Sequence, residues 1–327
     1  MTRSTSEILE PEVTTTTPTI PVAKDKDPRG FFKTALSRFF KRKLNVVALV
    51  VFGFIAIISA IAPILTSTFI GTTPAYFRAS FSPAYAPPGT TETLRTGANV
   101  VHWLGTDELG RDTLTRLLHA GGASLSIGFL VAIIIVLIGV PVGLLSGFFG
   151  GWVDDFFNAI IQIINNIPGL YLFIILAGIF RPDILFLSLI FGLLSWTQTA
   201  RQVRGLTLTM RNREFVTASI AVGARYPRIL VQHLLPNIVS ILVVLVGADI
   251  ALAMLGEAAL SFLGFGIRDP DVSWGKLLAN SSNYLTYSGN HNPFLIIGPG
   301  MMIFITILSI YLIADGLRDA FDPALRK

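Results

Sequence analysis

Four amide side chains recur inside one apolar segment and are the first candidates for contact with a solute. They lie three or four residues apart, on one face of a helix: Asn158, Gln162, Asn165 and Asn166. A polar face turned toward lipid is unfavourable, so this face must meet protein or water. The pattern predicts the lining of a solute path, and hydrogen bonding that only holds helices together is the alternative.

Two acids and a further amide lie in or beside later apolar runs. Asp249 is the one acid deep inside its run, and Glu257 follows eight residues later on nearly the same helical face. An ionisable group within a membrane segment is a functional candidate by default, although a structural partner from another helix would also explain it. Gln198 lies near Arg201 and Gln202, where it either completes the path lining or reaches the lipid headgroups.

Motifs for other chemistry are absent from the sequence. There is no phosphate-binding Gly-x-x-x-x-Gly-Lys-Ser/Thr string, and the one Gly-Lys pair, Gly275-Lys276, is followed by leucine. No metalloprotease motif or nucleophile elbow occurs, the four histidines are scattered, and cysteine is lacking. We therefore expect a chain that is not an enzyme and that binds no cofactor or metal itself.

Composition indicates the elements that carry these residues. The 327 residues are 52% hydrophobic and only 14% charged, with a mean hydropathy of +0.66. A soluble protein of this size could not cover so much apolar surface, which makes the lipid bilayer the expected solvent. The net charge of +5 does not indicate nucleic acid, because the Lys and Arg residues cluster beside apolar runs.

Apolar runs of membrane-spanning length predict an all-α membrane protein with six transmembrane helices. They cover residues 44–65, 123–149, 156–180, 184–204, 238–262 and 294–314. A signal peptide is the alternative for the first, although its run is too long and too far from the start. The uncharged part of the fourth has 17 residues (184–200), so a re-entrant segment is the alternative there.

Positive charges orient the helices. Of the 25 Lys and Arg residues, 18 fall in the segments that six spans with an internal N-terminus place inside, and 7 fall outside. The positive-inside rule then puts both termini in the cytoplasm. The predicted organisation is a disordered cytoplasmic tail (1–30), a first transmembrane helix with an external loop before the second (31–122), and a five-helix core (123–327).

The internal segment between the fourth and fifth spans, residues 205–237, predicts a short helix, a corner and a second short helix. Glu214 suits the first turn of a helix, and Gly223 can take the left-handed conformation that ends one. Pro227 is placed to start the next helix and Pro236 to end it before the fifth span. Several arginines make this surface basic, so contact with anionic headgroups is one explanation of the pattern.

The spacing in this segment also resembles the Glu-Ala-Ala loop of ABC-importer permeases. Glu214, Ala218, Gly223 and Leu235-Pro236 stand at the matching places, whereas Ser219 and His233 depart mildly from the pattern. The resemblance implies that this coupling loop (residues 205–237) holds a coupling helix that docks on an ATPase subunit. It assigns that role to Glu214, Ala218, Ser219, Gly223 and Pro236.

Three further blocks resemble the dipeptide/oligopeptide branch of these permeases, in order along residues 30–327. They are 102–118 (HWLGTDELGRDTLTRLL), 257–266 (EAALSFLGFG) with 273–275 (SWG), and 315–323 (DGLRDAFDP). In the first block, Thr106 and Asp107 are capping candidates, and its leucines would also suit a separate interfacial helix.

Membership of that branch implies a multi-pass permease subunit in the cell (inner or plasma) membrane. Its partners would be a homologous permease, two cytoplasmic ATPase subunits that carry ATP-Mg, and an external solute-binding protein. Peptides are the implied cargo, but relatives often carry an arginine and an aspartate where this chain has Ala159 and Gln162. Oligosaccharides or another small solute are therefore an alternative, as is an ion-coupled secondary transporter that uses Asp249.

Overall fold

The computed structural model describes residues 28–67, 83–93, 99–269, 271–284 and 292–321. The predicted disordered tail lies outside the described residues up to residue 27, and a helix already begins at Pro28. The last residues of the block 315–323 also lie outside them.

Helices make up most of the described chain. They are α1 (Pro28–Lys41), α2 (Lys43–Leu65), α3 (Thr113–Phe149), α4 (Gly151–Asn165), α5 (Gly169–Ile179), α6 (Ile184–Met210), α7 (Glu214–Ala221), α8 (Tyr226–Arg228), the π-helical η3 (Ile229–Leu234), α9 (Leu235–Phe262), α10 (Trp274–Tyr284) and α11 (Phe294–Phe321). A small antiparallel hairpin of β1 (Thr90–Thr93) and β2 (Asn99–His102) pairs Thr90 with His102.

Five helices among the described residues are long and apolar enough to cross a membrane: α2, α3, α6, α11 and the continuous run Tyr226–Phe262. The predicted third span is instead two helices, α4 and α5, which bend by 69°. Pro168 disfavours helical geometry in the preceding residue and lacks an N–H, so the break falls there. With this bent pair counted as one, the structure has up to six candidate spans.

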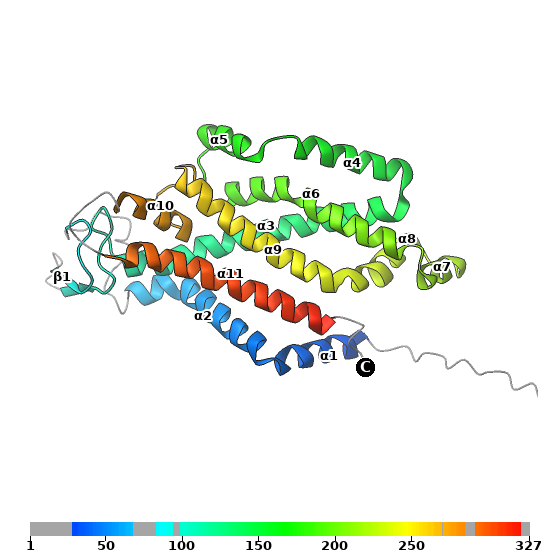
Figure 1. The fold of residues 1–327 in the computed structure, drawn as a ribbon, viewed down its shortest axis with the longest axis horizontal. Coiled ribbons are helices and arrows are strands. Elements are labelled where there is room, and N and C mark those ends of the chain that lie inside the picture. The colour runs from blue at the N-terminus through cyan, green and yellow to red at the C-terminus, as the bar shows by residue number, and fades with distance from the viewer. Residues whose placement is uncertain (1–27, 68–82, 94–98, 270, 285–291, 322–327) are drawn as a thin grey trace, which may run out of the picture.

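The fourth predicted span is a continuous helix, because α6 has 27 residues with no break. The re-entrant alternative therefore does not describe residues 184–204. Figure 1 shows α4 and α5 advancing together from the α7 end of the molecule toward the hairpin end before α6 returns.

The second predicted span begins ten residues earlier than expected. α3 has 37 residues, roughly 55 Å at 1.5 Å per residue, so it extends well beyond a hydrocarbon core of about 30 Å. Its N-cap is Asp112, whose Oδ2 accepts a hydrogen bond from the Thr115 N–H at 2.7 Å. The prediction that Thr106 or Asp107 caps a helix is therefore wrong, and no separate interfacial helix forms over residues 102–118.

Helices α3 and α6 pack closely at the centre of the fold because one face of α3 is lined with glycine. A Cβ atom on Gly143 would lie 2.6 Å from the Ala200 carbonyl oxygen, and one on Gly139 or Gly147 would lie 2.9 or 2.8 Å from a carbonyl oxygen of α6. Such small residues let helix backbones approach each other in membranes. α6 is thereby fixed against α3 over much of its length.

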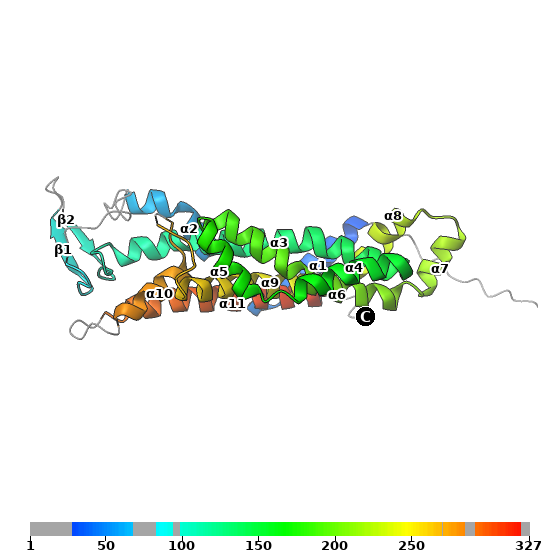
Figure 2. The ribbon, with the colours of Figure 1, turned by 90° about the horizontal axis from the view of Figure 1, so that it is seen from above.

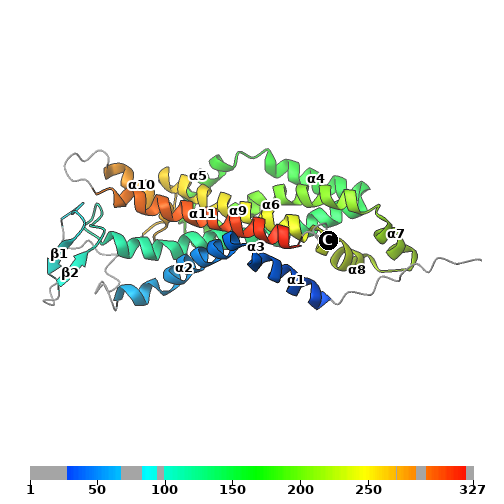
Figure 3. The same ribbon diagram turned by 60° about the horizontal axis from the view of Figure 1, so that its bottom comes forward.

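The remaining helices flank this centre. Figure 1 shows α4 and α5 along one edge and α2 with α11 along the other, while the hairpin and α7 lie at opposite ends. Figure 2 shows the same two ends from above. In Figure 3, α1 turns away from the axis of α2, and its Ala35 and Phe39 pack against Ala320 of α11.

Candidate functional site

The predicted coupling residues Glu214, Ala218, Ser219 and Gly223 lie together on α7 and its C-terminal turn. Glu214 is exposed in the first turn, where a negative charge suits the helix dipole. The Ser219 hydroxyl is used within the helix, since it donates to the Phe215 carbonyl at 2.7 Å.

Gly223 ends α7 as predicted. Its φ is +84°, in the left-handed region that favours glycine. The Gly223 N–H donates to the Ile220 carbonyl at 2.9 Å, and the Ala224 N–H donates to the Ser219 carbonyl at 3.0 Å. This pair of bonds is the Schellman motif, which reverses the chain directly after the helix.

Helix α7 is anchored near its N-terminal end and exposed at its C-terminal end. Val216 is fully buried and belongs to the same apolar cluster as Val203 of α6 and Ile229 of η3. In contrast, Val222 is 89% exposed and Ile220 is 45% exposed at the far end of the molecule. A short helix that is buried near its N-terminal end and exposes apolar side chains at its C-terminal end is suited to dock on another protein.

Pro236 does not end the second helix of the loop, so that prediction is wrong. Pro227 begins it as expected, but η3 then joins α8 to α9 in one helical run. A π-type bond from the Leu235 N–H reaches the Leu230 carbonyl, five residues back, and Pro236 follows directly after this π-helical turn, at the start of α9. Pro236 therefore lies on the other limb of the loop from α7.

In the predicted amide stripe on α4, two side chains have hydrogen-bond partners and two have none within the described residues. Asn158 Nδ2 donates to Asp154 Oδ1 at 2.7 Å, and Asn165 Oδ1 accepts from Thr197 of α6 at 2.9 Å. Gln162 and Asn166 are exposed and have no side-chain partner within the described part of the chain. Hydrogen bonding between helices therefore accounts for Asn165, and the lining of a solute path stays a prediction for the stripe.

Three consecutive residues of α6, Thr197 to Thr199, make side-chain hydrogen bonds that involve the predicted polar residues. Thr197 bonds to α4, and the Thr199 hydroxyl donates to Asp249 of α9 at 2.9 Å. Between them, Gln198 is exposed and accepts from Arg201 Nη2 at 2.7 Å. Asp249 therefore has a structural partner, and it is separated by α6 from the exposed amides of α4.

Glu257 has a structural role that its sequence position did not reveal. Its carboxylate is 2% exposed and accepts hydrogen bonds from Ser261 and Ser273, each at 2.6 Å. The neighbouring Trp274 is 1% exposed and donates through Nε1 to the Leu117 carbonyl of α3 at 3.0 Å. These bonds fix α10 against α9 and α3.

The block 102–118 folds into a charged network rather than an interfacial helix. Asp107 Oδ1 accepts from the backbone N–H groups of Leu109 and Arg111, both at 2.9 Å. Its Oδ2 accepts from the Arg111 side chain at 2.7 Å and also bonds to Arg116. Arg111 and Arg116 are both buried and share Asp107, and Arg111 also lies 3.6 Å from Glu108 and 3.7 Å from Asp269, so the buried positive charges are paired.

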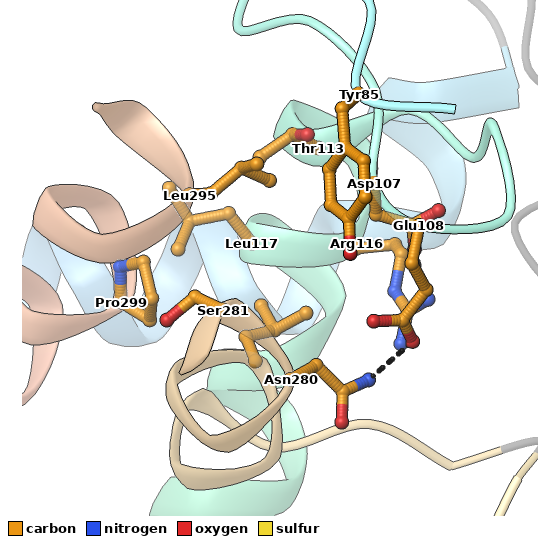
Figure 4. Close-up of a pocket in the computed structure, with 11 residues that line it drawn as sticks. Tyr85, Asp107, Glu108, Thr113, Arg116, Leu117, Asn280, Ser281, Leu295 and Pro299 are labelled. Atoms are coloured by element: carbon orange, nitrogen blue, oxygen red, sulfur yellow. Dashed lines mark hydrogen bonds and ion pairs between the residues drawn. The ribbon is translucent and has the colours of Figure 1, made fainter. Parts of the chain in front are cut away.

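This network borders a small pocket between the hairpin-end loop and helices α3, α10 and α11 (Figure 4). Asn280 of α10 donates to Glu108 Oε1 at 2.9 Å across its rim. Burial and the nearby charge of Asp107 raise the pKa of the Glu108 carboxyl. The pocket lining is mostly apolar, with Leu117, Leu295 and Pro299 on one side.

His102 lies buried between two carboxylates at the base of the hairpin. Its Nδ1 is 2.9 Å from Asp112 Oδ1, and its Nε2 is 3.1 Å from Glu92 Oε2. Burial lowers the pKa of the imidazole, but hydrogen bonds and charge from Asp112 and Glu92 outweigh it, so the pKa is raised above its ordinary value of 6.5. In the described part of the chain, no group of His, Asp and Glu side chains is arranged to hold a metal ion.

Two family models match this chain. A model of N-terminal transmembrane domains of oligopeptide transport permease C matches residues 30–88. A model described as binding-protein-dependent transport system inner membrane component matches residues 139–327, more than half of the chain. The chain belongs to this family. It is therefore a multi-pass component of a membrane transport system.

Three relatives of this permease are similar to it in sequence over most of its length. The oligopeptide transport system permease protein OppC of Mycobacterium tuberculosis is 37% identical over 249 residues, 76% of this chain and 81% of that protein. OppC of Bacillus subtilis is 33% identical over 302 residues, 92% of each chain. The dipeptide transport system permease protein DppC of Alkalihalophilus pseudofirmus is 30% identical over 296 residues, 90% of this chain and 91% of that protein.

Proposed function

We propose that this permease is one half of the translocation pathway of an ATP-driven importer of peptides. The printed names of its relatives concern oligopeptide and dipeptide transport, which supports peptides as the cargo. The sequence has no phosphate-binding loop, so ATP-Mg is bound and hydrolysed on separate partner subunits. Two ATPase subunits, a homologous permease and an external solute-binding protein complete the assembly.

The observation that carries the proposal is the geometry of α7. Val222 at its C-terminal end is exposed, and Val216 near its N-terminal end is buried in the permease core. This arrangement gives a docking helix that is rigidly connected to the core. Glu214, Ala218, Ser219 and Gly223 form its contact with the ATPase, and Pro236 supports the return limb. The α7 end is the cytoplasmic end, and the hairpin end faces outward.

This orientation places both chain termini in the cytoplasm. α1 and the end of α11 lie toward the α7 end (Figure 1), which agrees with the bias of positive charge toward the proposed inner segments. The proposed divisions remain a tail, a first helix with its external loop, and a core of five spans in which α4 and α5 together form one broken span.

The exposed amides of α4 face the solute path and the homologous permease. Gln162 and Asn166 are polar, exposed and beside the break between α4 and α5. Asn158 and Asn165 are held in place beside them through their bonds to Asp154 and Thr197. Non-helical backbone at membrane depth is tolerated where it lines a cavity, which favours a path beside this break.

Transport by the reconstituted complex tests the function. The permease, its partner permease and ATPases are placed in proteoliposomes with internal ATP, and uptake of labelled tri- to pentapeptides is compared with uptake of oligosaccharides. We expect peptide uptake that requires ATP and the binding protein and persists when ionophores abolish all ion gradients. Uptake that collapses with the gradient while ATP stays high would replace this proposal by an ion-coupled transporter using Asp249, and uptake of oligosaccharides alone would change the cargo.

A further inference from the structure

A bidentate ion pair joins α4 to α6 near the α7 end of the bundle. Arg204 Nε lies 2.5 Å from Asp154 Oδ1, and Arg204 Nη2 lies 2.5 Å from Asp154 Oδ2. The two residues are 50 positions apart in the sequence, so the contact exists only in the folded bundle. Two parallel charge-assisted bonds fix both distance and orientation between the helices.

The same carboxylate also binds α3 and the next turn of α4. Ser146 of α3 donates to Asp154 Oδ1, and Asn158 donates to Asp154 Oδ1 at 2.7 Å and to its carbonyl at 2.9 Å. Asn158 belongs to the amide stripe of α4. One acid therefore connects three helices and orients the first residue of that stripe.

Besides this ion pair, α4 is held to the bundle by the bond of Asn165 to Thr197 and by the packing of Ile161 with its neighbours Ile160 and Ile164. Ile161 is the only buried residue of α4, whereas α3 and α6 are joined along the glycine face described above. Side-chain exposure is 15% for Asp154 and 30% for Arg204, so the pair is better shielded than a surface ion pair of little energetic value. Its share in positioning α4 is correspondingly large.

The α6 side of the pair leads directly into the coupling loop. Val203 precedes Arg204, is fully buried and belongs to the same apolar cluster as Val216 of α7. α6 ends at Met210, and only three residues separate it from Glu214 at the start of α7. A displacement of α7 therefore acts on the segment of α6 that carries Arg204.

We propose that Asp154 and Arg204 form a positioning link that transmits movement of the coupling loop to α4, the helix of the solute path. This inference rests on the proposed function, because it requires α7 to be moved by a partner ATPase. The link acts through α4 and touches neither ATP nor solute. Breaking it leaves α7 docked on the ATPase, but α4 no longer follows.

The test compares transport with ATP hydrolysis in the reconstituted complex. The variants are Asp154→Asn, Arg204→Gln, Arg204→Lys and the double variant Asp154→Asn/Arg204→Gln. Asp155→Asn is the matched control, because Asp155 is exposed and has no ion pair within the described residues. Arg268→Gln is the control for the arginine, because Arg268 is exposed and its side chain has no bond or ion pair within the described residues.

We expect peptide transported per ATP hydrolysed to fall roughly tenfold in each link variant, the size expected when charge-assisted hydrogen bonds are lost. Binding-protein-stimulated hydrolysis should stay within about twofold of the parent, and the double variant should be no worse than either single variant. The controls should behave like the parent. An unchanged ratio in the assembled link variants overturns the proposal, as does an equal fall in transport and hydrolysis.

A distance measurement separates positioning from structural support. This chain has no cysteine, so spin labels attached at Phe156→Cys on α4 and Leu308→Cys on α11 label no other site of the permease, which is labelled before it is combined with its partners. We expect the distance distribution to shift on ATP binding in the parent and not in Asp154→Asn or Arg204→Lys. A shift that persists in these variants overturns the link.

Failure of the link and failure of the proposed function give different results. If the parent complex takes up no peptide with ATP, the proposed function fails irrespective of Asp154. If the parent is active and the link variants keep the parent ratio, only the link fails. Should Asp154→Asn not assemble, Arg204→Lys decides, because it retains the positive charge and loses only the bidentate geometry.

Discussion

Replacement of Gly223 by valine isolates the backbone requirement of the coupling loop. Gly223 has a φ of +84°, and no atom lies within 4 Å of the position of an added Cβ. The new side chain therefore meets open space, and the cost arises from the left-handed backbone alone. For an L-residue this cost is about 1–2 kcal/mol, and a β-branched side chain lies at the upper end.

That free energy converts into an expected loss of docking. A change of about 1–2 kcal/mol lowers an equilibrium constant by a factor of roughly 5–30. Since the Schellman turn sets the direction of the chain after α7, we expect the Gly223→Val permease to assemble in the membrane but to bind the ATPase about 5–30 times more weakly. Titration of the ATPase against permease in lipid nanodiscs measures this affinity, and proteoliposome uptake measures the accompanying loss of transport.

Two controls make the result specific. Gly223→Asn should bind within about threefold of the parent, because asparagine tolerates the left-handed region. Gly205→Val adds the same side chain on α6, where an added Cβ also meets no atom within 4 Å and the backbone is helical, and it should retain affinity. If Gly223→Val binds the ATPase as tightly as the parent, the left-handed turn is not needed and the docking role of α7 is refuted.

Three further outcomes are expected from the packing and the charges. Gly143→Leu should lower the unfolding free energy by about 1–3 kcal/mol through overpacking against α6, which thermal unfolding in nanodiscs would measure. Gly53→Leu should leave the unfolding free energy unchanged, since no atom lies within 4 Å of its added Cβ. The pKa of His102 is raised in the folded protein, so protonated His102 should stabilise the hairpin fully below pH 6.5, and this stabilisation should disappear as the pH rises through the raised pKa. In His102→Gln, the protection of the hairpin from hydrogen exchange should no longer depend on pH in this way. Trp274→Phe should destabilise the hairpin end by about 1 kcal/mol, because the buried hydrogen bond from the indole to the Leu117 carbonyl is lost. Unfolding monitored by a probe on α10 would detect this change.

Local patterns predicted the fold where one segment decides its own structure. Gly223 ends α7 as its position indicated, and the apolar runs located the spanning helices. The start of α3 was misplaced because Thr106, Asp107 and Asp112 are all chemically able to cap, and only the buried network around Asp107 determines which one does. The break at Pro168 was visible in the sequence, but a proline inside a membrane helix is often accommodated.

The candidate site could be predicted only in part, because several of its residues depend on distant partners. The helical spacing of the α4 amides was correct, but the bond from Asn165 to Thr197 needs two helices to meet. Glu257 was noted as an acid within the bilayer, whereas its stabilising hydroxyl on Ser273 lies beyond the end of α9. Asp154 carried no signal at all, because its partner is 50 residues away.

The distribution of polar bonds indicates which part of the permease moves. At the hairpin end, Glu257 and Trp274 tie α9, α10 and α3 together through buried hydrogen bonds. Along the edge of the bundle formed by α4 and α5, α4 has a single buried residue and is followed by a 69° break. Segments with few buried contacts open at the lowest free energy cost. α4 is thus the helix whose displacement against the core costs least, and α6 connects it to α7.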